Sequence, residues 1–286
     1  MEPAATLPPP AASEKPSIFQ SVRELLTYRE LLYNLVLREL KARYKNSALG
    51  FFWSLLNPLG MMLVFTLVFT VMTPNTSFDN YPIFFLCGYL PWQYLSNGVM
   101  SGINSVVANA NLVKKVYFPR EVLPSAAVLA ALVNFLLALA VLFVALLVTR
   151  TPLSPYIWLL PVLIFIQTCF VLGVAFFLSA LNVFYRDTQM IMEIVMQAWF
   201  FLTPVFYPIG VLPQSYEFLG MNLDIRRLMY ILNPMASLIA AYRDLLYWGY
   251  RTDLDFLART GLTVMVVLVV GYWFFIRHSS RFAEEL

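Results

Sequence analysis

The sequence predicts an all-α integral membrane protein with six transmembrane helices, an N-terminal amphipathic helix at the membrane interface, and re-entrant helices between spans five and six. Of its 286 residues, 60% are hydrophobic and 12% are charged, whereas soluble domains carry about 25% charged residues. Residues 83–105 and 122–149 contain no Asp, Glu, Lys or Arg, and about 20 apolar residues suffice to cross a bilayer. Most Lys and Arg residues fall in the segments that this topology places inside, as short cytoplasmic loops require.

Composition and motifs exclude several classes of function. The net charge of +3 is too small to indicate nucleic-acid binding. Cys87 and Cys169 both lie in apolar runs, so no disulfide framework is expected. A single histidine, His278, excludes a multi-histidine metal site, and no glycine is followed by lysine, which excludes a phosphate-binding loop of the Walker type. We therefore predict no catalytic residue, no metal and no cofactor in this chain.

The N-terminal region changes character after a tail. Residues 1–27 begin with a Pro- and Ala-rich stretch and predict a flexible cytoplasmic tail. In residues 28–47, apolar side chains recur at helical spacing, at Tyr33, Leu37, Leu40 and Tyr44. Basic side chains occupy another part of the helical wheel, at Arg38, Lys41, Arg43 and Lys45. An amphipathic helix in the membrane interface explains both patterns; the alternative is a soluble helix that packs on a partner.

The first two spans are predicted at residues 51–72 and 81–105. Asn57-Pro58 lies about two turns into the first span and should kink it. The connecting residues 73–80 contain no Lys or Arg, as expected of an outer loop. In the second span, Gly98 and Gly102 are four residues apart, a spacing that allows another helix to approach closely in lipid.

A polar island, residues 107–124, separates the second span from the third. Its sequence is VANANLVKKVYFPREVLP, and it carries Lys114, Lys115 and Arg120 against a single Glu121. Short basic loops stay on the cytoplasmic side of a membrane. The island therefore lies inside.

The same island has the signals of a short helix. Asn109 or Asn111 is expected to cap its start, and Pro119 to end it. The helix would lie across the membrane surface with Tyr117 and Phe118 at its end. A plain connector needs only a few polar residues, so these features favour a docking surface.

The remaining spans are predicted at 122–149, at 156–184, from 188 onward, and at 260–276. Prolines interrupt the region after the fifth span, at Pro204, Pro208, Pro213 and Pro234. Because repeated prolines do not suit one straight span, we interpret residues 204–250 as re-entrant or interfacial helices that return to the outer face. The alternative is two further spans, in which Arg226, Arg227 and Arg243 would be costly at mid-bilayer.

Glu193 is the single acidic residue within a predicted span. It is either a packed or interface-level residue or part of a proton relay. A proton-driven transporter normally has more ionisable groups in its spans, together with internal repeats, and this sequence shows neither. We therefore expect that the energy for any uphill transport comes from another subunit.

Five segments are informative as a set: RELKARYKNSALGFFWSLLNPL at 38–59, NANLVKKVYFPREVLP at 109–124, NVFYRDT at 182–188, WFFLTPVFYP at 199–208, and RFAEEL at 281–286. Together they resemble the membrane-spanning subunit of type-2 ABC exporters, in the branch that exports O-antigen, capsule or teichoic-acid polysaccharides. The resemblance covers residues 31–286.

The resemblance implies a type-2 ABC exporter transmembrane domain over residues 28–286, in the bacterial plasma (inner) membrane, with both termini cytoplasmic. This permease would pair with a second copy of itself and with two copies of a separate ATPase subunit, which would carry ATP and Mg. Residues 107–121 would contain the coupling helix, which sits in a cleft of that ATPase. The side chains implied to make this contact are Asn109, Asn111, Lys114, Lys115, Tyr117, Phe118 and Arg120.

The implied substrate is a polysaccharide linked to undecaprenyl pyrophosphate, which moves outward from the cytoplasmic side. Residues 28–47 would be a gate helix at the entrance. Its basic side chains Arg38, Lys41, Arg43 and Lys45 are candidates to bind the pyrophosphate, and anchoring to anionic membrane lipids is the alternative. Because sugar CH faces stack on aromatic rings, a glycan conduit is expected to be lined by Trp92, Tyr94, Trp199, Phe200 and Tyr207.

Two other functions are compatible with these patterns. An exporter of a small lipid or drug would share the fold but not the motifs of the polysaccharide branch. A membrane-embedded enzyme or scaffold would work without an ATPase partner.

Overall fold

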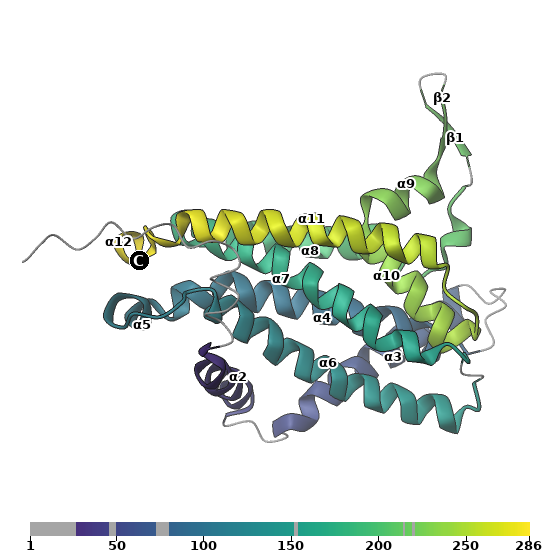
Figure 1. Ribbon diagram of the computed structural model, residues 1–286. Coiled ribbons are helices and arrows are strands. Elements are labelled where there is room, and N and C mark those ends of the chain that lie inside the picture. The colour runs from purple at the N-terminus through teal and green to yellow at the C-terminus, as the bar shows by residue number, and fades with distance from the viewer. Residues whose placement is uncertain (1–26, 46–49, 73–79, 152–153, 214, 219–220) are drawn as a thin grey trace, which may run out of the picture.

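The computed structural model describes residues 27–45, 50–72, 80–151, 154–213, 215–218 and 221–286. They form an elongated helical bundle (Figure 1). Helices α5 and α12 lie at one end, which we call the α5 end, and the hairpin β1–β2 lies at the other, which we call the hairpin end. The predicted N-terminal tail, apart from Thr27, and most of the predicted outer loop 73–80 lie outside the described residues.

The first half of the chain follows the predicted order of elements. Its helices are α2 (Arg29–Tyr44), α3 (Trp53–Met72), α4 (Tyr81–Ala108), α5 (Ala110–Lys115) and α6 (Val122–Val148), with a short 3-10 turn at Gly50–Phe52 before α3. Their bounds agree with the expected interface helix, the first three spans and the short helix of the polar island. Pro58 lies inside α3, and the helix continues through it.

The second half is more interrupted. Its helices are α7 (Leu160–Phe184), α8 (Thr188–Leu202), α9 (Ile225–Leu232), α10 (Pro234–Arg243), α11 (Leu254–Ser279) and α12 (Phe282–Glu285). Short 3-10 turns precede α7 at Ile157–Leu159 and follow α8 at Ile209–Val211, and a π-helical turn at Asp244–Trp248 follows α10. Residues 185–187 form a short turn between α7 and α8, in the gap between the two spans predicted there.

Three helices in the described residues are long and apolar enough to cross a membrane: Val122–Val148, Ile157–Phe184 and Leu254–Ser279. Shorter apolar helices lie at Leu56–Val68 and Thr188–Leu202. Helix α4 is also long, but it carries the polar residues Gln93, Asn97 and Asn104 along its length. The structure therefore agrees with a multi-pass membrane protein.

Small residues set the distances between the central helices. A Cβ atom added to Gly98 would lie 2.6 Å from Val171 Cγ1, and one added to Gly102 would lie 2.7 Å from Ala175 Cβ, both on α7. Such distances leave no room for a side chain, so the backbones approach closely. The predicted role of the Gly98/Gly102 pair is confirmed.

The crossing of α7 and α11 is closer still, and sequence analysis did not predict it. Gly173 and Gly271 face each other there, and a Cβ atom on Gly271 would lie 2.0 Å from the carbonyl oxygen of Gly173. Because the obstructing atom belongs to the backbone, no rotation of a side chain could relieve the clash.

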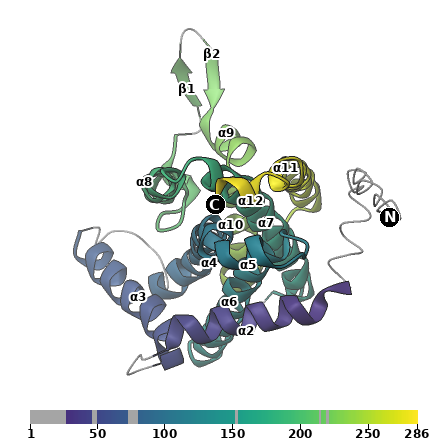
Figure 2. The same cartoon turned by 90° about the vertical axis from the view of Figure 1, so that its left-hand side faces the viewer.

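Helix α2 lies across the bundle rather than along it, and it packs against α6 (Figure 2). Leu35 is buried, and Leu31, Leu32 and Val36 pack against the same apolar cluster. Tyr33, which was expected to share the apolar face, is exposed instead. The helix is therefore apolar on more than one side, as suits an element with protein on one face and lipid on another.

The hairpin end contains the region predicted as re-entrant helices. Short helices α9 and α10 are present, but strands β1 (Ser215–Phe218) and β2 (Met221–Asp224) also form an antiparallel hairpin, with Ser215 opposite Asp224. The all-α prediction is wrong at this hairpin. At the start of α10 the Asn233 side chain accepts hydrogen bonds from Met235 N and Ala236 N and donates one to Thr203 Oγ1 at 2.9 Å.

Arg243 connects the hairpin end to the core. Its side chain is only 5% exposed and donates hydrogen bonds to the carbonyl oxygens of Pro204 (2.6 Å) and Val205, while its guanidinium lies 3.7 Å from the centre of the Phe84 ring. A Cβ atom on Gly88 would lie 2.7 Å from Arg243 Nη2. One buried cation therefore holds α4, the segment after α8, and α10 together.

Candidate functional site

Helix α5 and the residues that follow it up to Phe118, here called the tip, contain the basic pair and the aromatic residues predicted to form a docking surface. Lys114 and Lys115 close helix α5 and are exposed, and the Tyr117 side chain that follows is 98% exposed. A fully exposed tyrosine beside two lysines suits contact with another protein, because aromatic side chains are enriched at interfaces. Asn111 is exposed on the same short helix.

Three other residues predicted to act in docking, Phe118, Arg120 and Asn109, are buried or half-buried. Phe118 is buried in the apolar cluster that contains Val113, so it anchors the tip from within. Arg120 is half-buried, and burial lowers the pKa of its guanidinium, an effect that Tyr117 and Glu121 oppose. The outward-facing part of the site is therefore smaller than predicted.

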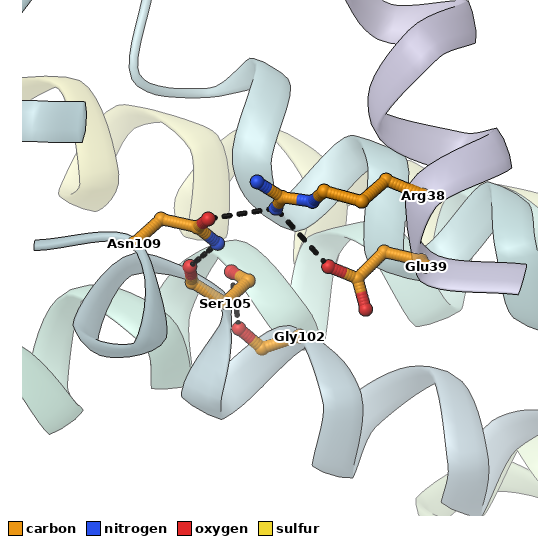
Figure 3. A network of polar contacts seen from close by, with 5 residues as sticks. All are labelled: Arg38, Glu39, Gly102, Ser105 and Asn109. Carbon is orange, nitrogen blue, oxygen red and sulfur yellow. Dashed lines mark hydrogen bonds and ion pairs between the residues drawn. The ribbon is translucent and has the colours of Figure 1, made fainter. Parts of the chain in front are cut away.

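Asn109 joins the tip to α2 (Figure 3). Its Oδ1 accepts a hydrogen bond from Arg38 Nη2 at 2.7 Å, and its Nδ2 donates one to the carbonyl oxygen of Ser105 at 2.7 Å. The arginine can only donate and the carbonyl can only accept, so together they fix the orientation of the amide. Asn109 occupies the N-cap position of α5, but its side chain makes no capping bond, so the capping prediction is wrong for this residue.

Arg38 links the basic face of α2 to the tip through this hydrogen bond, and its Nη2 also lies 3.4 Å from Glu39 Oε1. Arg38 and Asn109 are 71 residues apart in the sequence. A displacement of the tip would therefore act directly on α2.

The basic face of α2 borders an open, shallow groove of about 830 Å³, whose described lining residues all come from α2 and the residue after it. Arg38, Lys41 and Lys45 line it, together with Asn34. The predicted Arg43 belongs to the same helix, and its side chain lies outside the described residues. Several cationic groups around one open groove are suited to a multiply charged anion at a membrane interface.

The C-terminal helix α12 supports the tip, which sequence analysis missed. Phe282 is fully buried, with its ring 5.2 Å from that of Phe275 and 6.1 Å from that of Phe184. It belongs to the same cluster as Val113 and Phe118. The closing RFAEEL motif thus has a structural role beside α5, which its apolar Phe282 among polar neighbours could have indicated.

The five aromatic residues predicted to line a conduit pack mainly inside the protomer. Trp92 is buried, and its ring centre lies 5.8 Å from that of Trp199 and 5.7 Å from that of Phe200. Tyr94 is buried and donates a hydrogen bond to Thr168 Oγ1 at 3.1 Å. Tyr207 is half-buried at the hairpin end. Their role in lining a path stays a prediction.

The described residues contain no group of three His, Cys, Asp or Glu side chains that could hold a metal ion. Glu193 is exposed on α8, where Gln189 Nε2 lies 3.4 Å from its Oε1.

Comparison with known proteins connects these features to transport. Residues 30–247 match the ABC-2 type transporter family. The chain is 37% identical over 265 residues to an O-antigen export system permease protein of Myxococcus xanthus, covering 93% of this chain and 98% of the relative. It is 31% identical over 258 residues to a Klebsiella pneumoniae protein of the same description, covering 90% and 95%. A polysialic acid transport protein of Escherichia coli is 22% identical over 247 residues, covering 83% and 89%.

Proposed function

Since this chain belongs to the ABC-2 type transporter family, we propose that it is the permease subunit of an ATP-driven exporter that moves polysaccharide such as O-antigen or capsule across the bacterial inner membrane. The observation that carries this proposal is the similarity to O-antigen export permeases along nearly the whole length of both chains. The chain has no nucleotide-binding loop of its own, so ATP and Mg would be bound by a partner ATPase.

The α5 tip is the surface that contacts this ATPase in our proposal. Lys114, Lys115 and Tyr117 face outward there, and Val113 and Phe118 hold the tip to the bundle. Movement imposed on the tip would reach α2 through the hydrogen bond between Asn109 and Arg38. In this way ATP hydrolysis would change the position of the helix at the substrate entrance.

The basic groove on α2 is the proposed site for the lipid anchor of the substrate. A polysaccharide built in the cytoplasm on undecaprenyl pyrophosphate would present two phosphates at the depth of this helix. Among the described residues, Lys41 and Lys45 form no ion pair, whereas Arg38 also lies near Glu39. The two lysines are therefore available to bind an anion, and Arg38 would respond when the anion binds.

The transported chain needs a hydrated path, because hydroxyl groups buried without hydrogen-bond partners cost a few kcal/mol each. The six spans of one copy leave little internal space, so we place the path between two copies of the chain, which form a two-fold pair. Exposed apolar side chains on α3 (Leu63, Leu67) and α8 (Met190, Ile194) are available to meet the second copy or lipid. Both termini would be cytoplasmic, with the α5 end inside.

The test is charge reversal at the tip in the complete complex. Replacing Lys114 and Lys115 by Glu should leave the permease inserted but reduce its co-purification with the ATPase and the amount of polysaccharide at the cell surface. The matched control reverses Arg227 and Arg259, two exposed arginines near the hairpin end, and should change neither. If the Lys variant assembles and exports normally, α5 is only a connector; a wild-type complex that moves small lipids but no glycan would refute the substrate.

A further inference from the structure

A cleft with polar walls is lined by residues of α3, α4 and α6. These three helices, labelled in Figure 1, contact one another pairwise. Its volume is about 340 Å³, within the range of about 300–1,000 Å³ typical of ligand pockets. Four side-chain carboxamides line it, from Asn57, Gln93, Asn97 and Asn134. It is distinct from the basic groove on α2.

The position of these carboxamides is unusual for apolar helices. Gln93 and Asn97 are four residues apart in α4, so they lie on one face of that helix. Asn134 lies in α6, whose other residues include no charged side chain. Asn57 is exposed, and Gln93, Asn97 and Asn134 are half-buried. Their carboxamides therefore border the open space of the cleft rather than a packed apolar core.

The carboxamides of Asn57, Gln93 and Asn97 make no hydrogen bond within the part of the chain that the structure describes. Each carboxamide can both donate and accept. Their natural complement is a group that also does both, and sugar hydroxyls have this property, whereas a lipid acyl chain has neither capacity.

The other walls of the cleft fit the same class of ligand. Trp53, whose side chain is 53% exposed, contributes an accessible aromatic ring, on which the CH face of a sugar can stack. Tyr94 also lines the cleft, but it is buried and its ring stacks on that of Phe135. No Asp, Glu, Lys or Arg lines the cleft. The ligand portion bound here is therefore uncharged, which excludes the pyrophosphate itself.

We propose that this carboxamide-lined cleft binds uncharged sugar residues of the glycan, a step that rests on the proposed function. The cationic groove on α2 would hold the lipid pyrophosphate, and α6, which packs against both α2 and α3, would support both sites. The two sites would thus recognise the charged and the neutral part of one amphipathic substrate. Selection of glycan-loaded over unloaded carrier lipid would depend on the cleft.

The experiment measures binding rather than export. The purified complex in lipid nanodiscs is titrated with undecaprenyl pyrophosphate alone and with the glycan-loaded form extracted from the source strain. The test variant Gln93→Met with Asn97→Leu keeps side-chain size but removes both carboxamides. Loss of two hydrogen bonds should weaken binding of the loaded lipid about tenfold, with binding of the unloaded lipid unchanged.

The matched control is Asn104→Leu, a similar change at an exposed position of the same helix outside the cleft; it should bind both lipids as wild type does. If the double variant fails to assemble, the single Gln93→Met variant serves for the same test. Gln93→Asn, which keeps a carboxamide, should retain most of the preference for loaded over unloaded lipid. If the wild type prefers loaded lipid and the variants do so equally, the cleft inference is overturned while the proposed function stands. If the wild type shows no preference, the proposed substrate fails.

Discussion

The Gly173/Gly271 crossing gives the sharpest prediction, because its geometry is set by backbone atoms. In Gly271→Ala the new Cβ would start 2.0 Å from the Gly173 carbonyl oxygen, whereas ordinary van der Waals contact begins at 3.4 Å. To reach that distance, the Cβ and the carbonyl oxygen would have to move apart by about 1.4 Å, which requires α7 and α11 to separate. Overpacking of this kind costs about 1–3 kcal/mol, and the higher helix propensity of Ala returns about 1 kcal/mol.

The obstructing atom cannot rotate away, so we expect the upper part of this range and a net loss of about 2 kcal/mol in the free energy of unfolding. A loss of this size lowers Tm by about 4–8 °C for a chain of this length. The measurement is thermal unfolding of the purified protein in one detergent. Gly173→Ala should behave similarly, because its Cβ would lie 2.7 Å from Leu268 Cα.

Gly261→Ala is the matched control on the same helix. Its Cβ would have only Ile166 Cδ1 near it, at 3.9 Å, so its Tm should equal or exceed that of the wild type. Equal Tm values for Gly271→Ala and Gly261→Ala would refute the claim that close backbone contact holds α7 against α11.

Three further predictions concern the two ends of the bundle. Replacing Arg38 and Asn109 by Ala, singly and together, should give a coupling energy of about 1 kcal/mol in a double-mutant cycle of thermal stability. Additive effects of the two substitutions would argue against the hydrogen bond between these side chains. Arg243→Met should lower stability by about 3 kcal/mol, since several buried carbonyl groups lose their donor, and unchanged unfolding would contradict its bridging role. A cysteine at Arg150 should react with an impermeant thiol reagent from outside, and one at Asn111 should not, in a protein lacking Cys87 and Cys169; labelling at Asn111 would reverse the orientation.

Much of the candidate site was accessible from the sequence because its signals are local. The uncharged runs fixed the positions of α4 and α6, and the basic pair Lys114 and Lys115 marked a tip that is in fact exposed. The spacing of apolar residues and the clustering of charge extend over only one or two helical turns, so neighbouring residues in the sequence reveal them. The spacing of Gly98 and Gly102 belongs to the same class.

Other features depended on partners that are distant in the sequence. Phe118 was predicted to face a partner protein, but it is buried in a cluster that Phe282 of the C-terminal helix completes. Nothing in the local sequence states which residue will cover an aromatic ring. The hairpin β1–β2 was also missed, because its short strands lie within a segment dominated by prolines and apolar residues.

The amino-acid sequence by itself determined the membrane class, the order of the helices and the exposed basic tip, since these follow from hydropathy and charge along the chain. The tertiary structure decided which groups meet: Arg38 with Asn109, Gly173 with Gly271, and the carboxamides of α3, α4 and α6 around one cleft. These pairings depend on how whole helices pack, and a helix presents many equivalent faces until its neighbours select one.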